Sequence, residues 1–326
     1  MYYIGIDVSK KSLHCLLLLD PQTGKQRTKA IPNTPAGHAT VVQWGTRFAA
    51  CEPQDLHLLL EATGVYHEAL AETLHQAGCR VSVLNPLHVK RFAQSRGSHS
   101  KTDQQDRLVL ARFGVERQPP AWVPPPPEVK QLKALLDRLD ALKGDIQREL
   151  NRQEQAHQAG APDSVSTSIA SMLEALREEQ RRLQRQIDDH IDRHPGLQQD
   201  RELLRSIPGI GTYLSLMLVT QLRATTFRNA RQAAAYLGLV PVEHQSGTSV
   251  WRRPHLSKAG SARLRAALYF PAVVASRYNP DVAALYRRLL ARGKCKMAAL
   301  GAAMRKLVHI AFGVLKHQTP YAAQVT

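Results

Sequence analysis

Four acidic residues are spaced so that they could bind a divalent metal ion. Asp7 ends the apolar run YIGID and Glu61 ends DLHLLLE, while Asp103 and Asp106 lie three residues apart, on one face of an expected helix. Carboxylates at strand ends converge at one edge of a sheet. Hard cations such as Mg²⁺ or Mn²⁺ prefer oxygen ligands, and two such ions can support phosphoryl transfer.

Each acid alone also has an ordinary explanation. Asp103 could simply begin a helix after Lys101 and Thr102, as a cap. Asp7 is harder to explain in this way, because an acid in an apolar frame is costly to bury without a cation or hydrogen-bond partners. Together the four acids favour a metal site.

The elements that must position these acids alternate between strand and helix patterns. Three strand-like runs open the chain, and helices and strands then alternate, which predicts an α/β layer fold. We expect strands at 2–8, 13–19, around 27–31, within 55–64 and at 80–85, and helices at 36–50 and 66–77.

The sequence divides into four parts. Residues 1–118 form the expected α/β domain, and the six prolines of the segment 119–129 predict a stiff linker at 119–127. Apolar residues then recur at intervals of three and four, which predicts a helical hairpin or coiled coil at 128–195. The apolar positions are Val129, Leu132, Leu135, Leu136, Leu139, Leu142, Ile146 and Leu150, then Ile169, Met172, Leu176, Leu183 and Ile187. Such a stripe can pack within the chain or between copies, and we expect a homo-oligomer.

Positive charge is concentrated in the remaining part, 196–326. The chain has a net charge of +17. Residues 201–326 hold 19 Lys and Arg against the acids Glu202, Glu243 and Asp281, a net charge of +16, which leaves +1 for the first 200 residues. Such an excess repels itself unless a polyanion neutralises it, so this part is predicted to bind nucleic acid.

Two features of this basic part could contact DNA. The segment LRSIPGIG predicts a helix-hairpin-helix-like turn, in which Gly209 and Gly211 would expose backbone amides to phosphate. An ordinary turn between helices is the alternative. Further on, Ser246 lies in a turn-rich stretch and could be only a turn residue. The basic residues expected to bind nucleic acid are Lys101, Arg252, Arg253, Lys258, Arg263 and Arg265.

The motifs resemble a known family as a set. YIGIDVSKKSL, LLLEATGVY, VLNPLHVKRFAQSRGSHSKTDQQD and SIPGIGTYLS, in this order, are similar to the bridge-RNA-guided transposases of the "IS one-ten" insertion-sequence family. The resemblance extends over essentially the whole chain. It implies an RNase H-like, RuvC-type N-terminal domain, a coiled-coil middle and a mainly α C-terminal transposase domain. It assigns the Asp-Glu-Asp-Asp quartet of that family to Asp7, Glu61, Asp103 and Asp106.

The resemblance also implies a serine nucleophile and a set of partners. The family's serine lies in a Ser-Gly step after a segment like LGL, which here is Ser246; Thr248 and Ser249 are the neighbouring hydroxyls. The implied partners are target and donor DNA, both paired to one structured guide (bridge) RNA, and further copies of the chain in a dimer or tetramer. In the assembled complex the acids would have to meet Ser246.

Other chemistries lack their motifs. The sequence contains no G-x-x-x-x-G-K-[ST] and no paired Cys/His spacing, which argues against a P-loop motor and a zinc site. Cys15, Cys51, Cys79 and Cys295 are expected to be reduced core residues. No signal peptide is recognisable, so we expect a bacterial, cytoplasmic, nucleoid-associated protein without a membrane segment. Two rival functions stay open: a RuvC-like hydrolytic junction endonuclease, which needs the acids but not Ser246, and a non-catalytic nucleic-acid scaffold.

Overall fold

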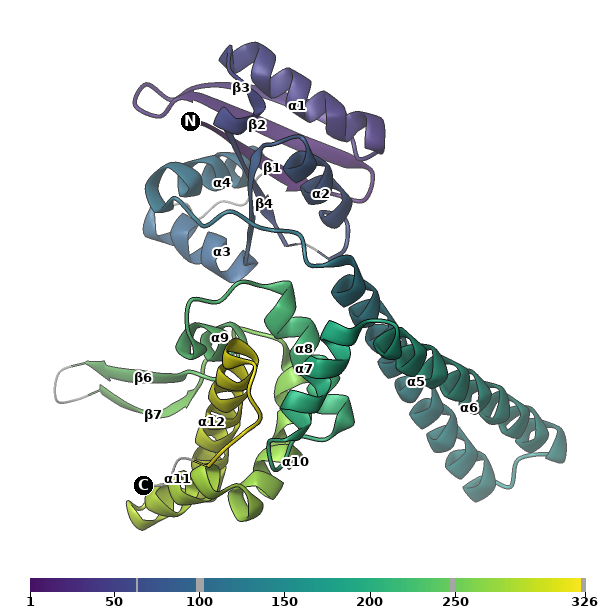
Figure 1. Ribbon diagram of the computed structural model, residues 1–326. Coiled ribbons are helices and arrows are strands. Elements are labelled where there is room, and N and C mark those ends of the chain that lie inside the picture. Colours follow the sequence, from purple (N-terminus) through teal and green to yellow (C-terminus); the bar gives the residue numbers. More distant parts are fainter. Residues whose placement is uncertain (63, 98–102, 247–249, 324–326) are drawn as a thin grey trace. The chain divides into compact units, whose positions relative to one another are not determined.

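The computed structural model describes residues 1–62, 64–97, 103–246 and 250–323, and the chain forms two compact units, 1–124 and 125–326 (Figure 1). The N-terminal unit contains β1 (Tyr2–Val8), β2 (Ser12–Asp20), β3 (Lys25–Pro32), α1 (Pro35–Ala49), β4 (Leu56–Glu61), α2 (Glu68–Gln76), β5 (Arg80–Leu84), α3 (Pro86–Ser95) and α4 (Asp103–Arg117). The C-terminal unit contains α5 (Pro127–Gln158), α6 (Asp163–Asp192), α7 (Pro195–Arg205), α8 (Thr212–Ala224), α9 (Ala230–Tyr236), β6 (Pro241–Ser246), β7 (Val250–Leu256), α10 (Ala262–Tyr278), α11 (Pro280–Ala291) and α12 (Lys296–His317).

The N-terminal unit is built on a five-stranded mixed sheet. The strand order is β3-β2-β1-β4-β5. The first three strands are antiparallel neighbours, whereas β4 runs parallel to β1 and β5 parallel to β4. This order and these directions are those of an RNase H-like domain. The predicted α/β fold is therefore confirmed.

Helices cover both faces of this sheet. Helices α1 and α2 lie on one face and α3 and α4 on the other (Figure 1). Ile4 and Ile6 of β1 pack into the core on the α1 side, whereas Tyr3 packs with α4. Successive side chains of a strand point to opposite faces, so a sheet covered on both sides needs near-continuous apolar strands. That requirement explains runs such as LLLL in β2.

The first residues of the proline-rich segment are hydrogen-bonded to strand β5 of the sheet. The backbone N–H of Trp122 donates to the Val81 carbonyl at 2.7 Å, and Ser82 Oγ donates to the Pro120 carbonyl at 2.8 Å. The division between the units falls after Pro124, inside the linker expected at 119–127. Helix α5 begins at Pro127, inside the stretch expected to be free of helix, because proline lacks only an N–H that the first helical turn does not use.

Helices α5 and α6 form the helical hairpin that the apolar period predicts. The buried stripe of α5 consists of Val129, Leu132, Leu136, Leu139 and Leu142. On α6 the prediction was wrong at Met172, whose side chain is 51% exposed, because its neighbour Leu173 is the buried residue. Both positions fit a spacing of three or four to Leu176, so the period alone could not separate them.

The remaining helices share one hydrophobic core with the base of the hairpin. Of the helices in the described ranges, only α12 is long and apolar enough to cross a membrane. It packs against α9, α10 and α11, and 56% of its most apolar stretch is buried, which is the behaviour of a core helix. Cys295, just before α12, is exposed, so the expectation that all four cysteines are core residues is wrong for this one.

Candidate active site and nucleic-acid interface

The sheet brings Asp7 and Glu61 to the same edge. Strands β1 and β4 are parallel neighbours in which Ile6 pairs with Leu60. Asp7 and Glu61 are the next residues on these two strands, and both are half-buried. The backbone positions of Asp7 and Glu61 are therefore neighbours at the carboxyl ends of β1 and β4.

Helix α4 brings its first residues to this edge as well. A Cβ atom at Gly5 would lie 2.0 Å from the Arg107 carbonyl oxygen, and one at Gly114 would lie 2.6 Å from Tyr3 Cδ1. The helix therefore packs directly on β1 and runs in the opposite direction to it. Its N-terminal turn, which holds Asp103 and Asp106, lies toward the Asp7 end of the strand.

The chemistry of these four acids fits a hard divalent cation. Carboxylate oxygens are the ligands that Mg²⁺ and Mn²⁺ favour. Within the described residues, no group of three or more His, Cys, Asp or Glu is close enough to hold a metal ion. The side chain of Asp103, the fourth acid, lies outside the described part, as does all of Lys101.

Ser246 ends the first strand of a β-hairpin in the C-terminal unit. Strands β6 and β7 are antiparallel, with Ser246 opposite Val250 and His244 opposite Arg252. Sequence reasoning expected only a turn-rich stretch here and missed both strands. Residues 247–249 and the side chains of Ser246, Arg252 and Arg253 lie outside the described part.

Arg263, expected to bind nucleic acid, is instead used inside the C-terminal unit. Its guanidinium forms ion pairs with Asp137 and Asp140 of α5 and donates to the Leu136 carbonyl at 3.1 Å. Tyr213 of α8 donates to Asp140, and burial together with this bond raises the pKa of Tyr213 to about 12. These contacts tie α10 and α8 to the helical hairpin.

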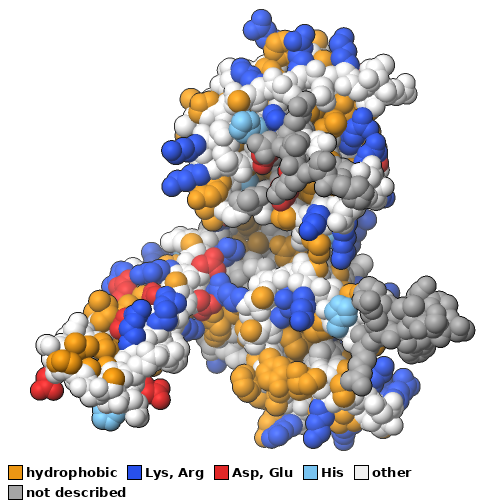
Figure 2. Space-filling view, turned by 180° about the vertical axis from the view of Figure 1, so that it is seen from behind, with side chains coloured by type: hydrophobic (Ala, Val, Ile, Leu, Met, Phe, Trp, Pro, Cys, Tyr) orange, Lys and Arg blue, Asp and Glu red, His pale blue; other side chains and the backbone are white. Residues whose placement is uncertain are grey.

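Arg265 also has partners within the fold. It donates to the carbonyls of Gly260 at 2.7 Å and Leu237 at 3.3 Å, and so closes the segment after α9 onto α10. With Arg263 and Arg265 engaged internally, Lys258, which is exposed, remains a candidate phosphate contact. On the face seen in Figure 2, the helical hairpin of α5 and α6 shows acidic and basic side chains together, whereas the rest of the C-terminal unit shows Lys and Arg with little acid.

The turn between α7 and α8 gives its two glycines different roles. Gly209 has a φ of +103°, and a Cβ there would lie 2.8 Å from the Pro271 carbonyl oxygen and 2.9 Å from Ala275 Cβ, so glycine is required by close packing on α10. Gly211 is exposed and precedes the first turn of α8. Of the two glycines, Gly211 is the one placed as expected for phosphate binding.

One buried ion pair was not predicted. Asp200 of α7 is 2% exposed and accepts two hydrogen bonds of 2.6 Å from Arg223 of α8. Gln318 Nε2 donates to the same carboxylate at 3.0 Å. The pair holds the two helices that flank the glycine turn, and it joins the residues after α12 to them.

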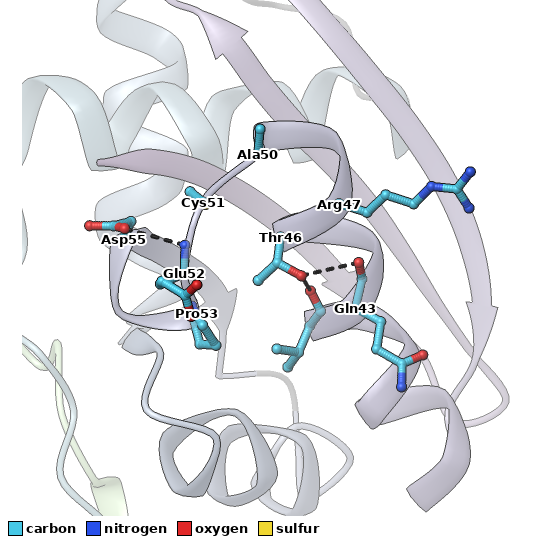
Figure 3. Close-up of a pocket in the computed structure, with 9 residues that line it drawn as sticks. Gln43, Thr46, Arg47, Ala50, Cys51, Glu52, Pro53 and Asp55 are labelled. Atoms are coloured by element: carbon cyan, nitrogen blue, oxygen red, sulfur yellow. Dashed lines mark hydrogen bonds between the residues drawn. The ribbon is translucent and has the colours of Figure 1, made fainter.

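A shallow pocket lies at the other end of the N-terminal sheet. It is formed between the end of α1 and the segment before β4, and Thr46, Arg47, Cys51 and Asp55 are among its lining residues (Figure 3). Strand β4 begins directly after Asp55 and ends at Glu61, so the pocket and the acids lie at opposite ends of the strand. The pocket is therefore not part of the acid site.

The chain combines an RNase H-like domain, which carries acids at the ends of its strands, with a basic helical unit. This combination is typical of enzymes that act on nucleic acids. Comparison with known proteins gives the family. Residues 201–287 match the family model described as Transposase IS116/IS110/IS902 family, and residues 4–158 match a DEDD model of the IS110 type described as Transposase. The chain is 32% identical over 332 residues to the "Pilin gene-inverting protein" of Moraxella bovis, covering 99% of this chain and 98% of that protein. Over 124 residues it is 32% identical to the "Insertion element IS110 uncharacterized 43.6 kDa protein" of Streptomyces coelicolor, covering 38% of this chain and 30% of that protein.

Among solved structures, the chain is similar to RuvC of Thermus thermophilus. The sequence identity is 17% and the TM-score 0.27, and the match covers 36% of this chain and 97% of RuvC. The fold assignment rests on the strand order and not on this superposition. The chain belongs to the IS116/IS110/IS902 family of transposases and is a DNA transposase or recombinase.

Proposed function

We propose that this transposase is an RNA-guided DNA recombinase that cleaves and rejoins DNA strands through Ser246, with Mg²⁺ or Mn²⁺ bound by its four acids. The observation that carries the proposal is that Asp7 and Glu61 follow a paired position on two parallel strands, and that the start of α4 is directed toward the same end of these strands. A relative named for gene inversion fits a reaction that both breaks and reseals DNA.

The acids act together in this proposal. Asp7, Glu61, Asp103 and Asp106 would hold the ion, which when bound supplies Lewis acidity for phosphate-ester cleavage. Carboxylates gathered at one edge repel one another unless a cation neutralises them. In this proposal a bound divalent ion would offset that repulsion and draw the acids together.

Ser246 would carry the covalent step. Its Oγ attacks a DNA phosphorus, so an Oγ–P bond forms while a P–O bond to deoxyribose breaks, and the serine proton is transferred to the leaving deoxyribose oxygen. A hydroxyl of the second strand then attacks the same phosphorus, the Oγ–P bond breaks, and the proton of that hydroxyl is transferred to the departing Oγ, which restores the serine. The phosphoserine link conserves the bond energy for rejoining, and nearby cations offset the charge that develops on the phosphate.

The basic C-terminal unit would hold target DNA, donor DNA and a structured guide RNA. Its charge supports this, because a net +16 over residues 201–326 favours polyanions. Arg252, Arg253, Lys258 and Gly211 are the contacts we propose there. A homo-oligomer is supported by α6, where Val165 and Met172 leave 43% and 51% of their surface exposed.

Two substitutions test the metal site. Asp7→Asn or Glu61→Gln should abolish strand cleavage yet leave DNA and RNA binding nearly intact, because each removes a metal-ligand charge without changing the basic unit. Asp20→Asn is the matched control. Asp20 is the last residue of β2, which runs antiparallel to β1, so it lies at the end of the strands opposite to Asp7. Full cleavage by Asp7→Asn in Mg²⁺ would contradict the assignment.

Two further measurements separate the alternatives. Ser246→Ala should abolish strand exchange, whereas a hydrolytic junction nuclease would keep cleaving. Exchange should also require the structured RNA. Equal exchange without RNA would contradict guidance, and nucleic-acid binding without any metal-dependent cleavage would indicate a scaffold.

A further inference from the structure

One side chain joins the two turns that leave the acid-bearing strands. Asn33, between β3 and α1, donates from Nδ2 to the Ser9 carbonyl at 2.8 Å and to the Tyr66 carbonyl at 3.2 Å. Ser9 follows Asp7 by two residues, in the turn after β1, and Tyr66 lies in the turn between β4 and α2, five residues after Glu61. Asn33 itself has no place in the motifs of the sequence.

The orientation of the Asn33 amide is fixed by its partners. Both N–H groups point at carbonyls, so Oδ1 must accept, and it accepts from Nε2 of His38 at 2.8 Å. His38 of α1 is 3% exposed, and burial lowers its pKa, so the ring is neutral with its hydrogen on Nε2. Its Nδ1 faces the hydroxyl of Thr73 on α2 at 3.5 Å. Helix α1 thus holds the amide in place through His38.

The two turns differ in how much other structure restrains them. The turn after β1 is closed by its own bonds, including Ser9 N–H to the Ser12 carbonyl at 2.9 Å and Ser12 N–H to Ser9 Oγ at 3.0 Å. The turn after β4 contains Gly64 at φ +59° and the exposed side chains of Val65 and Tyr66. A turn with exposed side chains and a glycine samples more conformations when a tether is lost. The bond from Asn33 ties this turn to the closed one.

We propose that Asn33 is a positioning residue for the acid site, a latch that holds the turns after β1 and β4 together and so fixes the spacing of Asp7 and Glu61. In this proposal Asn33 acts through the backbone carbonyls of Ser9 and Tyr66. The latch rests on the proposed function in assuming that these two acids bind the divalent ion. Without it the turns move independently, and the acids bind the ion more weakly.

Direct Mn²⁺ binding to the full-length protein, without DNA or RNA, tests the latch. Free Mn²⁺ is counted by its electron paramagnetic resonance signal during a titration. Asn33→Ala should weaken Mn²⁺ affinity about tenfold, because partners that orient metal ligands typically contribute at least this factor. Thr34→Ala is the matched control: it removes the neighbouring cap bond to the Gly37 N–H of α1, at 3.2 Å, and should keep the wild-type affinity.

Hydrogen exchange provides a readout that does not depend on metal. The amide of Glu68, which donates to the Val65 carbonyl at 3.3 Å, should exchange faster in Asn33→Ala than in Thr34→Ala. The Ser12 amide lies in the turn that is closed by its own bonds, so its exchange should change little. Asn33→Asp keeps the size and the acceptor for His38 but loses both donors, so it should behave like Asn33→Ala.

Three results would overturn the latch: Mn²⁺ affinity in Asn33→Ala equal to that of Thr34→Ala, unchanged exchange at Glu68, or wild-type behaviour of Asn33→Asp. Unchanged Mn²⁺ binding by Asp7→Asn has a different meaning, because it would remove the metal site on which the proposed function depends. Faster exchange at Glu68 in Asn33→Ala would in that case still show that Asn33 restrains the turn after β4.

Discussion

A methyl group at Gly5 should displace the helix that carries two of the acids without unfolding the sheet. A Cβ there would lie 2.0 Å from the Arg107 carbonyl oxygen and 2.9 Å from the Ala111 nitrogen, both in the backbone of α4. Restoring even a tight contact of 3.0 Å requires α4 to move by about 1 Å, because a helix backbone cannot rotate away as a side chain can. Overpacking of this kind costs about 1–3 kcal/mol. Misplacing catalytic groups by 1 Å can cost about 100-fold in rate.

Single-turnover cleavage, corrected for the folded fraction from circular dichroism, measures the effect of Gly5→Ala. Gly45→Ala is the matched control on the opposite face: its Cβ would lie 2.9 Å from Ile4 Cδ1 and from Leu56 Cδ1, which are ends of flexible side chains. We expect the control to retain the wild-type rate per folded molecule and Gly5→Ala to lose about 100-fold. Equal rates for the two variants would refute the placement of α4 as the carrier of catalytic acids.

Three further predictions concern residues in the interior of each unit. Arg223→Ala should cost about 3 kcal/mol in urea unfolding, because it leaves the buried carboxylate of Asp200 without a cation and with only the bond from Gln318. Asp200→Asn should cost about 1 kcal/mol, because Arg223 is 43% exposed and can be hydrated; the reverse order would contradict the pairing. Burial, together with the charge of Arg80, lowers the pKa of His57 to about 4 from its ordinary 6.5, so unfolding takes up a proton between these pH values. The free energy of unfolding should therefore fall as pH drops from 6.5 toward 4, and His57→Gln should flatten that decline. Arg263→Gln should lower stability and leave unchanged the slope of log K for DNA binding against log salt concentration, whereas Arg253→Gln should reduce the magnitude of that slope by about 0.9. A reduced slope for Arg263→Gln would instead indicate that Arg263 contacts DNA.

The strands and the acid positions could be predicted from local sequence because burial on both faces of the sheet leaves a strong local pattern. The runs YYIGIDV and LHLLLE are apolar until the acid at or near their ends, so the order of strands also placed Asp7 and Glu61 at one edge. The β6–β7 hairpin lacks such a pattern. Its second strand, VWRRPHL, contains a proline and two arginines, and nothing in it alternates strongly enough to indicate a strand.

Contacts between distant residues left no local trace. Arg263 lies in a basic stretch and resembles a phosphate ligand, but its acidic partner Asp137 is 126 positions earlier in the chain. Asn33 likewise owes its role to carbonyls at positions 9 and 66, since backbone carbonyls carry no residue type that a motif could reveal. Such roles follow only from the fold.

Mass spectrometry of a trapped protein–DNA adduct tests the role of Ser246 most directly. A strand-exchange reaction is denatured midway, the DNA is trimmed with nuclease, and the modified peptide is sequenced. We predict a nucleotide on Ser246, no adduct in Ser246→Ala, and an adduct with at least partial activity in Ser249→Ala. A nucleotide on Thr248 or Ser249 would contradict the assignment of the nucleophile, and a reaction that cleaves DNA with no adduct on any residue would replace the recombinase mechanism with hydrolysis.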